Sequence, residues 1–341
     1  MNEISTIGLD LAKSVFQVHG ADASGAPVLR KKLRRDAVLG FFAKLEPCLV
    51  AMEACAGAHY WAREIARFGH DTRLIPPAYV KPYVKRQKND AADAEAICEA
   101  ARRPTMRFVA VKSAEQQASA VVFRARDLLV RQRTQIINAL RAHLGEYGAV
   151  VAKGPAHVAK LVTMIANGTT APPEALVALR SLVSTLQSLK EKIDVLDAEI
   201  ATRAREDQVA RRLMSVPGIG PVIATAIVAL APAAKSFENG RHFTAWLGLV
   251  PRQRSSGGRE LLGKITKAGD RTLRRLLIIG ANAVVRWAVR NPPPEGSWLA
   301  NMLARKPRQL VTVALAGKMA RIAWALMAKG ETYRASGAVA A

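Results

Sequence analysis

The chain has 341 residues, half of them hydrophobic, so it is long enough for two domains with sizeable cores and is not an intrinsically disordered protein. Its 51 lysines and arginines outnumber 27 acidic residues and give a formal net charge of +24. A protein this basic usually meets a polyanion. Nucleic acid is the first expectation and an anionic membrane surface the weaker one.

The cysteines and the apolar runs indicate a cytoplasmic protein without a membrane partner. Cys48, Cys55 and Cys98 are odd in number and form no C-x-x-C pair, which argues against a disulfide framework or a zinc site. The first residues lack the basic and apolar pattern of a signal peptide. The apolar run at 222–230 is too short to cross a bilayer, and Arg286 interrupts a later one.

The first 80 residues alternate between strand and helix patterns. Short apolar runs predict strands at 4–9, 15–19, 28–32, 48–52 and 72–75, and residues 36–45 and 58–68 predict helices. Three strands, a helix, and then alternating strand and helix predict a mixed α/β sheet. Asp10 follows the first strand, Glu53 follows the fourth, and a basic connector at 81–88 follows the last.

An Ala-rich stretch, residues 88–97, predicts a helix that carries Asp90 and Asp93 on one face. Two adjacent carboxylates repel each other unless a cation or a proton intervenes. If the strands ending at Asp10 and Glu53 are neighbours, four acids converge and could hold two magnesium or manganese ions for phosphodiester chemistry. The alternative is a solvated helix face whose acids are neutralised by Lys85, Arg86 and Lys88.

The middle of the chain is dominated by helix patterns. Residues 113–144 predict one long helix, whereas 145–173 are broken by glycine and proline and predict no clear element. Leucine and isoleucine then recur at alternating spacings of three and four from Leu179 to Ile200, which is a heptad seam. We expect this seam to pack against the 113–144 helix as a hairpin that also helps oligomerisation, or to pair between subunits.

A glycine-containing turn, Val216–Pro221, joins two predicted helical segments, the second at 222–230. The pattern is typical of a helix-hairpin-helix, in which the backbone N–H groups of Gly218 and Gly220 would meet a DNA phosphate. The alternative is an ordinary glycine-rich connection between helices.

Ser255 and Ser256 lie beside two glycines in a predicted loop that also carries three arginines. The arginines could hold a scissile phosphate beside a serine hydroxyl, but a serine nucleophile needs a base or a metal, and the nearby sequence offers no obvious base. The alternative is a flexible loop that only contacts phosphates. A basic surface then continues into a helix that reaches about Val289, and two helices at 297–304 and 308–328 close the chain. The residues predicted to contact nucleic acid are Gly218, Gly220, Arg252, Arg254, Arg259, Lys264, Lys267 and Arg271, and the basic helix also carries Arg274 and Arg275.

Seven motifs occur in an order that identifies a family. They are Gly8–Lys13, Glu53, Lys88–Ile97, Pro217–Gly220, Gly248–Pro251, Ser256–Gly258 and Ile265–Gly269. With these motifs the chain resembles the DEDD-type insertion-sequence transposases of the IS one-ten family, which are related to the Piv-type DNA invertases.

The resemblance implies three parts. Residues 1–112 would be a RuvC-like domain of the RNase H fold that binds magnesium, with manganese as a substitute, through Asp10, Glu53, Asp90 and Asp93. Residues 113–206 would form long helices and a coiled coil. Residues 207–341 would form a mainly helical transposase domain with a helix-hairpin-helix, whose nucleophile falls on Ser256, with Ser255 in reserve.

The resemblance further implies recombination of donor and target DNA through a covalent serine–DNA link, guided by a structured noncoding RNA of the element. It implies dimers that form tetramers, in which the acids of one subunit complete a site with the serine of another. Two other functions stay open on the residues: a metal-dependent Holliday-junction-type nuclease that uses water, and a non-enzymatic nucleic-acid-binding protein from a decayed element.

Overall fold

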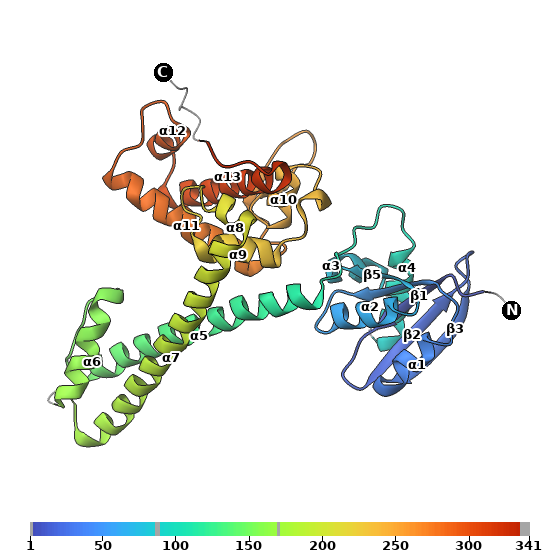
Figure 1. Ribbon diagram of the computed structural model, residues 1–341, viewed down its shortest axis with the longest axis horizontal. Helices are drawn as coiled ribbons and strands as arrows, with labels where there is room; N and C mark the ends of the chain where they lie inside the picture. The colour runs from blue at the N-terminus through green and yellow to red at the C-terminus, as the bar shows by residue number, and fades with distance from the viewer. Residues whose placement is uncertain (1–2, 86–88, 169–170, 335–341) are drawn as a thin grey trace. The chain divides into compact units, whose positions relative to one another are not determined.

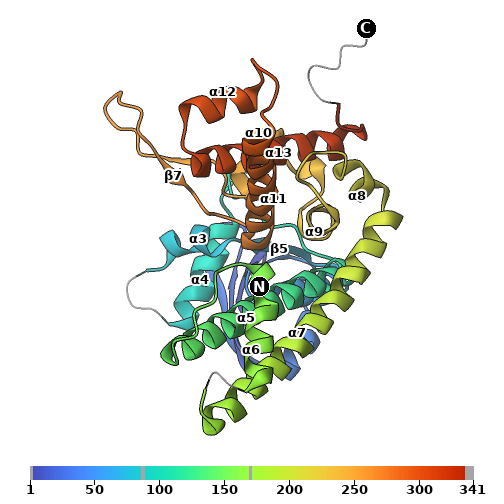
Figure 2. The same ribbon diagram turned by 90° about the vertical axis from the view of Figure 1, so that its left-hand side faces the viewer.

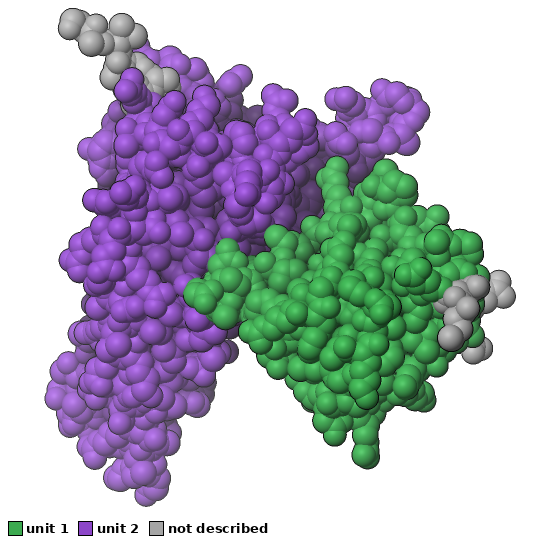
Figure 3. All heavy atoms as spheres, turned by 45° about the vertical axis from the view of Figure 1, so that its right-hand side comes forward, with its two compact units in different colours: residues 1–117 green, residues 118–341 purple. Residues whose placement is uncertain are grey.

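The computed structural model describes residues 3–85, 89–168 and 171–334, which belong to two compact units, Met1–Gln117 and Ala118–Ala341 (Figure 3). The end of the predicted basic connector, with Arg86 and Lys88, lies outside the described residues.

Unit 1 is built on one five-stranded sheet (Figure 1). Its strands are β1 (Thr6–Asp10), β2 (Val15–Ala21), β3 (Pro27–Arg34), β4 (Leu49–Glu53) and β5 (Asp71–Ile75), and they lie in the order β3-β2-β1-β4-β5. The first three pair antiparallel, whereas β4 runs parallel to both β1 and β5. The predicted mixed α/β sheet is therefore confirmed.

Helices cover both faces of this sheet. Helices α1 (Val38–Phe42), which follows the short η1 (Arg35–Ala37), and α2 (Ala58–Ala66) pack on one buried face of the sheet. Helix α4 (Asp90–Ala101) packs on the other face, next to α3 (Pro77–Val80) and η2 (Lys81–Tyr83). The described part of the predicted connector thus begins with one short helical turn, η2.

Glycine 8 lets α4 approach β1 closely. A Cβ atom at Gly8 would lie 2.1 Å from the carbonyl oxygen of Ala94 and 2.5 Å from the backbone nitrogen of Cys98. Any side chain here would push the helix away from the strand. Gly8 therefore sets the position of α4 over the end of β1.

Unit 2 consists mainly of helices. They are α5 (Ala114–Glu146), which begins in unit 1, η3 (Pro155–His157), α6 (Val158–Asn167), α7 (Pro173–Glu206), α8 (Gln208–Leu213), α9 (Pro221–Leu230), η4 (Ala234–Ser236), α10 (Gly240–Trp246), α11 (Arg271–Arg290), α12 (Trp298–Arg305) and α13 (Arg308–Lys329). Two strands, β6 (Pro251–Gln253) and β7 (Leu262–Ile265), form a separate small sheet.

The heptad seam is buried within the chain. Leu179 and Leu186 of α7 share one buried cluster with Leu140 of α5. Farther along, Arg126 of α5 forms an ion pair with Asp197 of α7. The helical hairpin is therefore present, and α6 packs into it from the region for which the sequence predicted no clear element.

Helix α13 is the one helix, among the described residues, that is long and apolar enough to cross a membrane. Ala316, Met319 and Ala323 on this helix are buried in the hydrophobic core of unit 2. Figures 1 and 2 show α11 and α13 side by side in this core. These contacts are typical of a core helix.

Candidate metal centre and basic hairpin

The ends of β1 and β4 bring Asp10 and Glu53 to the same edge of the sheet. The two strands pair in parallel, with Leu9 opposite Met52. Asp10 and Glu53 are the next residues along each strand, and parallel strands end on the same side. The condition that these strands be neighbours is therefore met.

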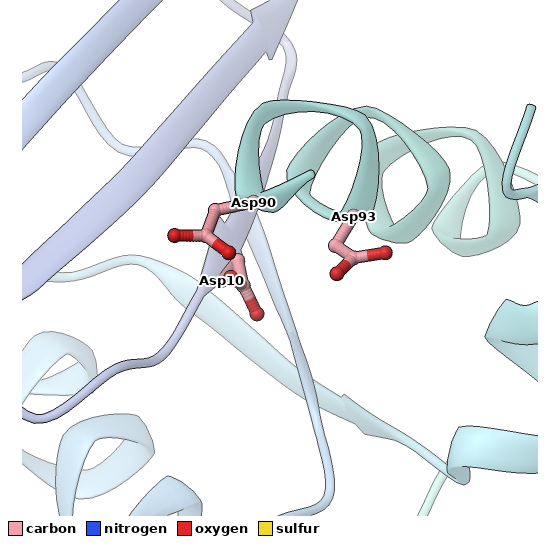
Figure 4. A group of neighbouring side chains, drawn as sticks. All are labelled: Asp10, Asp90 and Asp93. Atoms are coloured by element: carbon pink, nitrogen blue, oxygen red, sulfur yellow. The ribbon is translucent and has the colours of Figure 1, made fainter. Parts of the chain in front are cut away.

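The first turn of α4 places Asp90 and Asp93 beside Asp10. The side chain of Asn89 accepts a hydrogen bond of 2.8 Å from the backbone N–H of Ala92 and so caps the helix. One carboxylate oxygen from each of Asp10, Asp90 and Asp93 lies within 4.8 Å of the other two (Figure 4). An asparagine just before an Ala-rich run is a helix-start signal, so the sequence alone could have predicted that Asn89 caps this helix.

The surroundings of Asp10 destabilise the ionised form of its carboxyl group. The pKa of Asp10 is raised from 3.8 to about 6, chiefly because the carboxyl is partly buried, and further because Asp93, Asp90 and Glu53 are nearby negative charges. Glu53 is thus within electrostatic reach of Asp10, although it is outside the group of three close oxygens. A set of oxygen ligands that repel one another fits a hard divalent cation such as magnesium or manganese.

Of the three basic residues that could have neutralised this helix face, Lys85 is the one that the structure describes, and its ammonium group pairs elsewhere. Lys85 forms its ion pair with Glu95, one turn farther along α4 than the Asp90–Asp93 pair. Lys85 therefore does not neutralise Asp90 and Asp93, as the alternative of a solvated helix face would require.

The segment with Ser255 and Ser256 is a β-hairpin rather than an irregular loop. Strands β6 and β7 pair antiparallel, and Arg259 N–H donates to the carbonyl oxygen of Ser256 over 3.1 Å. Gly257 and Gly258 have φ values of 56° and 77°. Two consecutive residues with positive φ are the signature of a type I′ turn, which favours Gly-Gly.

The hairpin extends away from α11 and α13 (Figure 2). Ser256 is exposed in its turn, and among the described residues no group forms a hydrogen bond with its hydroxyl. Six basic side chains predicted to bind nucleic acid are all exposed on the hairpin or just after it: Arg252, Arg254, Arg259, Lys264, Lys267 and Arg271. The tip is therefore open to a large ligand.

The base of the hairpin is held by a buried arginine. Arg274 donates to the carbonyl oxygens of Leu247 (3.0 Å) and Ala268 (2.5 Å) and so joins the two loops that flank the hairpin. Between these loops the backbones touch, since a Cβ at Gly248 would lie 2.4 Å from the backbone nitrogen of Ala268. The sequence placed Arg274 on a basic surface, and this placement was wrong.

Two further expectations for this region need correction. Arg275 pairs with Asp127 of α5 and is not part of an open basic surface. The predicted basic helix begins only at Arg271, because Lys264 belongs to β7 and Lys267 lies in the following loop with a positive φ of 58°.

The two glycines of the turn between α8 and α9 serve different purposes. Gly218 has a φ of 88°, and a Cβ there would lie 2.7 Å from Val284 Cγ2 and 2.9 Å from the carbonyl oxygen of Gly280 in α11. Gly218 is thus committed to packing against α11. Gly220 is exposed, with open space where a Cβ would be.

Known proteins share both halves of this chain. Residues 7–149 match a DEDD transposase family of the IS110 type, and residues 210–293 match the family described as "Transposase IS116/IS110/IS902 family". A "Probable family 20 transposase" of Pseudomonas aeruginosa is 51% identical over 97% of this chain and 99% of that protein. The chain belongs to the IS116/IS110/IS902 family of transposases.

Other members of the family are similar over nearly the whole length. The transposase for insertion sequence element IS1328 of Yersinia enterocolitica is 38% identical over 98% of this chain and 99% of that protein. The transposase for insertion sequence element IS1111A of Coxiella burnetii is 39% identical over 98% of this chain and 92% of that protein. The resemblance inferred from the motifs is confirmed, and the protein is an insertion-sequence transposase that acts on DNA.

Proposed function

We propose that this transposase cuts and rejoins DNA through a covalent bond between Ser256 and a DNA phosphate, assisted by divalent metal in a RuvC-like domain. The observation that carries this proposal is the convergence of Asp10, Asp90 and Asp93 at the strand end. The strand order, with acids ending β1 and β4, supports an RNase H-like fold for unit 1.

Magnesium or manganese would be held by Asp10, Asp90 and Asp93, together with Glu53. The metal would supply positive charge that polarises a phosphodiester and favours loss of a hydroxyl proton. Oxygen-only ligands fit this role. The raised pKa of Asp10 fits it as well, because a nearby cation favours the ionised carboxylate.

The covalent step exchanges one phosphate ester for another. Ser256 Oγ attacks phosphorus, so an Oγ–P bond forms, the bond from phosphorus to one deoxyribose oxygen breaks, and that oxygen leaves as a hydroxyl after taking a proton. The proton of Ser256 passes to a base. A hydroxyl of the other DNA then attacks the phosphoserine and releases the serine, so no external energy source is needed. Arg252, Arg254 and Arg259 would offset the phosphate charge.

Sequence choice would come from a structured noncoding RNA that pairs with donor and target DNA, while the protein reads backbone and shape. The net charge of +24 supports binding of two polyanions at once. In the proposed assembly, dimers form a tetramer in which the acids of one subunit serve Ser256 of another.

An adduct trap tests the proposal. Protein purified with any RNA that accompanies it is incubated with labelled donor and target DNA and magnesium, and then denatured. We expect a labelled band at protein size that disappears in Ser256→Ala but persists in the matched control Ser255→Ala. Asp90→Ala should also abolish strand exchange while the protein stays folded. Recombination that persists in Ser256→Ala would refute the role of this serine.

One observation favours a second candidate function. Ser256 lies at an exposed hairpin turn, and no described group bonds to its hydroxyl, so the structure gives it no resident base. A metal-dependent junction nuclease would use water instead, with Ser256 as a phosphate contact only. Hydrolysed DNA ends without any protein–DNA adduct in the same trap would establish that alternative.

A further inference from the structure

Unit 2 has a second basic feature, at the end of α10 away from the hairpin. An open cavity of about 380 Å³ lies between α10 and α13, helices that are adjacent in Figures 1 and 2. Its lining consists of Asn239, Gly240, Arg241, Arg321, Trp324 and Ala325. The lining therefore contains two arginines and, among the described residues, no acid.

The walls of this cavity are firmly placed. A Cβ at Gly240 would lie 3.2 Å from the Cα and carbonyl oxygen of Arg321, so the two helix backbones nearly touch there. Asn239 caps α10 by accepting from the backbone N–H of Arg241 over 2.9 Å. The indole N–H of Trp324 donates to the carbonyl oxygen of Ala234 in η4 over 3.1 Å. The two arginines consequently project from fixed positions into one space.

The two guanidinium groups oppose each other electrostatically. The pKa of Arg321 is lowered, first by its partial burial and then by the nearby charge of Arg241. Neither arginine forms an ion pair within the described part of the chain, and the neighbouring acid, Glu238, lies 3.2 Å from His242. An anion between the two guanidinium groups would remove this repulsion.

We propose that Arg241 and Arg321 together grip one backbone phosphate of a nucleic acid, at a contact separate from the Ser256 hairpin. Guanidinium groups match phosphate oxygens with two parallel hydrogen bonds, and a pair of them suits a doubly contacted phosphate. The cavity is open to solvent, so the backbone of a long nucleic acid can reach it. The inference rests on the family's action on nucleic acid and not on serine chemistry.

Salt-dependent binding tests this site. The affinity of full-length protein for a duplex DNA and for a single-stranded RNA is measured by fluorescence anisotropy between 50 and 200 mM NaCl. The proteins compared are wild type, Arg241→Gln, Arg321→Gln and the double variant. One lost phosphate contact reduces the salt slope by about 0.9 on duplex DNA and by about 0.7 on a single strand. Over this fourfold range, wild-type affinity should therefore fall more than that of the double variant, by about 3.5-fold on the DNA or about 2.6-fold on the RNA. The nucleic acid that shows the change identifies the polymer held here.

The two single variants and a control variant decide whether the arginines share one phosphate. Because both arginines hold one phosphate, the double variant should lose little more slope than either single. Arg205→Gln removes one positive charge, as each single variant does, but from an exposed site on α7, and it should leave the salt slope unchanged. A double variant that matches wild type or Arg205→Gln on both polymers would overturn the proposal, as would additive losses, which indicate two phosphates. Thermal melting of each variant checks folding. The Ser256 adduct trap is scored separately, so either idea can fail alone.

Discussion

Replacing Asp10 by asparagine should stabilise unit 1 at neutral pH in the absence of divalent metal, while it removes transposition. The pKa of Asp10 lies at about 6 in the folded protein against 3.8 ordinarily. This difference corresponds to an upper limit of about 3 kcal/mol against the ionised carboxylate. Solvent reaches this half-buried group, so about 1–2 kcal/mol is the expected gain for the neutral amide.

The direction in which Asp10 changes folding stability with pH follows from proton binding. Between pH 4 and 6 the folded protein binds more protons at Asp10 than the unfolded chain, so the stability contributed by this group falls as pH rises through that window. Above pH 6 the ionised Asp10 carboxylate destabilises the folded protein to its full extent. At pH 4 the protonated carboxyl and the amide are nearly equivalent, so the advantage of the variant should shrink toward zero.

Hydrogen exchange of peptides from β1 and α4 reports the stability of this unit directly. In EDTA at pH 7.5, Asp10→Asn should be more protected than wild type, and magnesium should then protect wild type but not the variant. Asp36→Asn, at an exposed acid of the same unit, is the control and should change protection by less than about 0.5 kcal/mol. A variant less protected than wild type in EDTA, or an advantage that persists at pH 4, would refute the electrostatic reasoning.

Three further variants test the packing. Gly8→Ala should destabilise unit 1 by about 3 kcal/mol, because its Cβ would meet a carbonyl of α4 at 2.1 Å, whereas Gly40→Ala meets nothing within 4 Å and should be neutral in urea unfolding. Gly218→Ala should lower the melting temperature of unit 2, since it combines a φ of 88° with a clash against α11. Gly220→Ala would place its Cβ in open space and should leave the melting temperature unchanged. Equal effects of the two variants would contradict the packing role of Gly218. Arg274→Gln should lose about 1–3 kcal/mol and raise hydrogen exchange at the base of the hairpin, and unchanged exchange there would show that this arginine does not hold the loops.

The sequence alone determined the strands of unit 1, the long helices and the family, but not α6 or the β6–β7 hairpin. Alternating apolar runs located all five strands of unit 1, and the acids at the ends of two of them were visible without coordinates. The heptad seam likewise located α7. These features depend on residues close together in the chain, so periodicity and turn chemistry are sufficient to predict them. The motif order then identified the transposase family.

Only the tertiary structure decided which of these residues meet. Asp10 joins Asp90 and Asp93 because α4 crosses β1 at a glycine, a contact between segments about 80 residues apart. A spacing pattern cannot show such a contact, nor can it show that Arg274 turns inward while Arg241 meets Arg321. The sequence carries the charge of an arginine, but burial and long-range packing decide whether that charge holds a loop or faces a ligand.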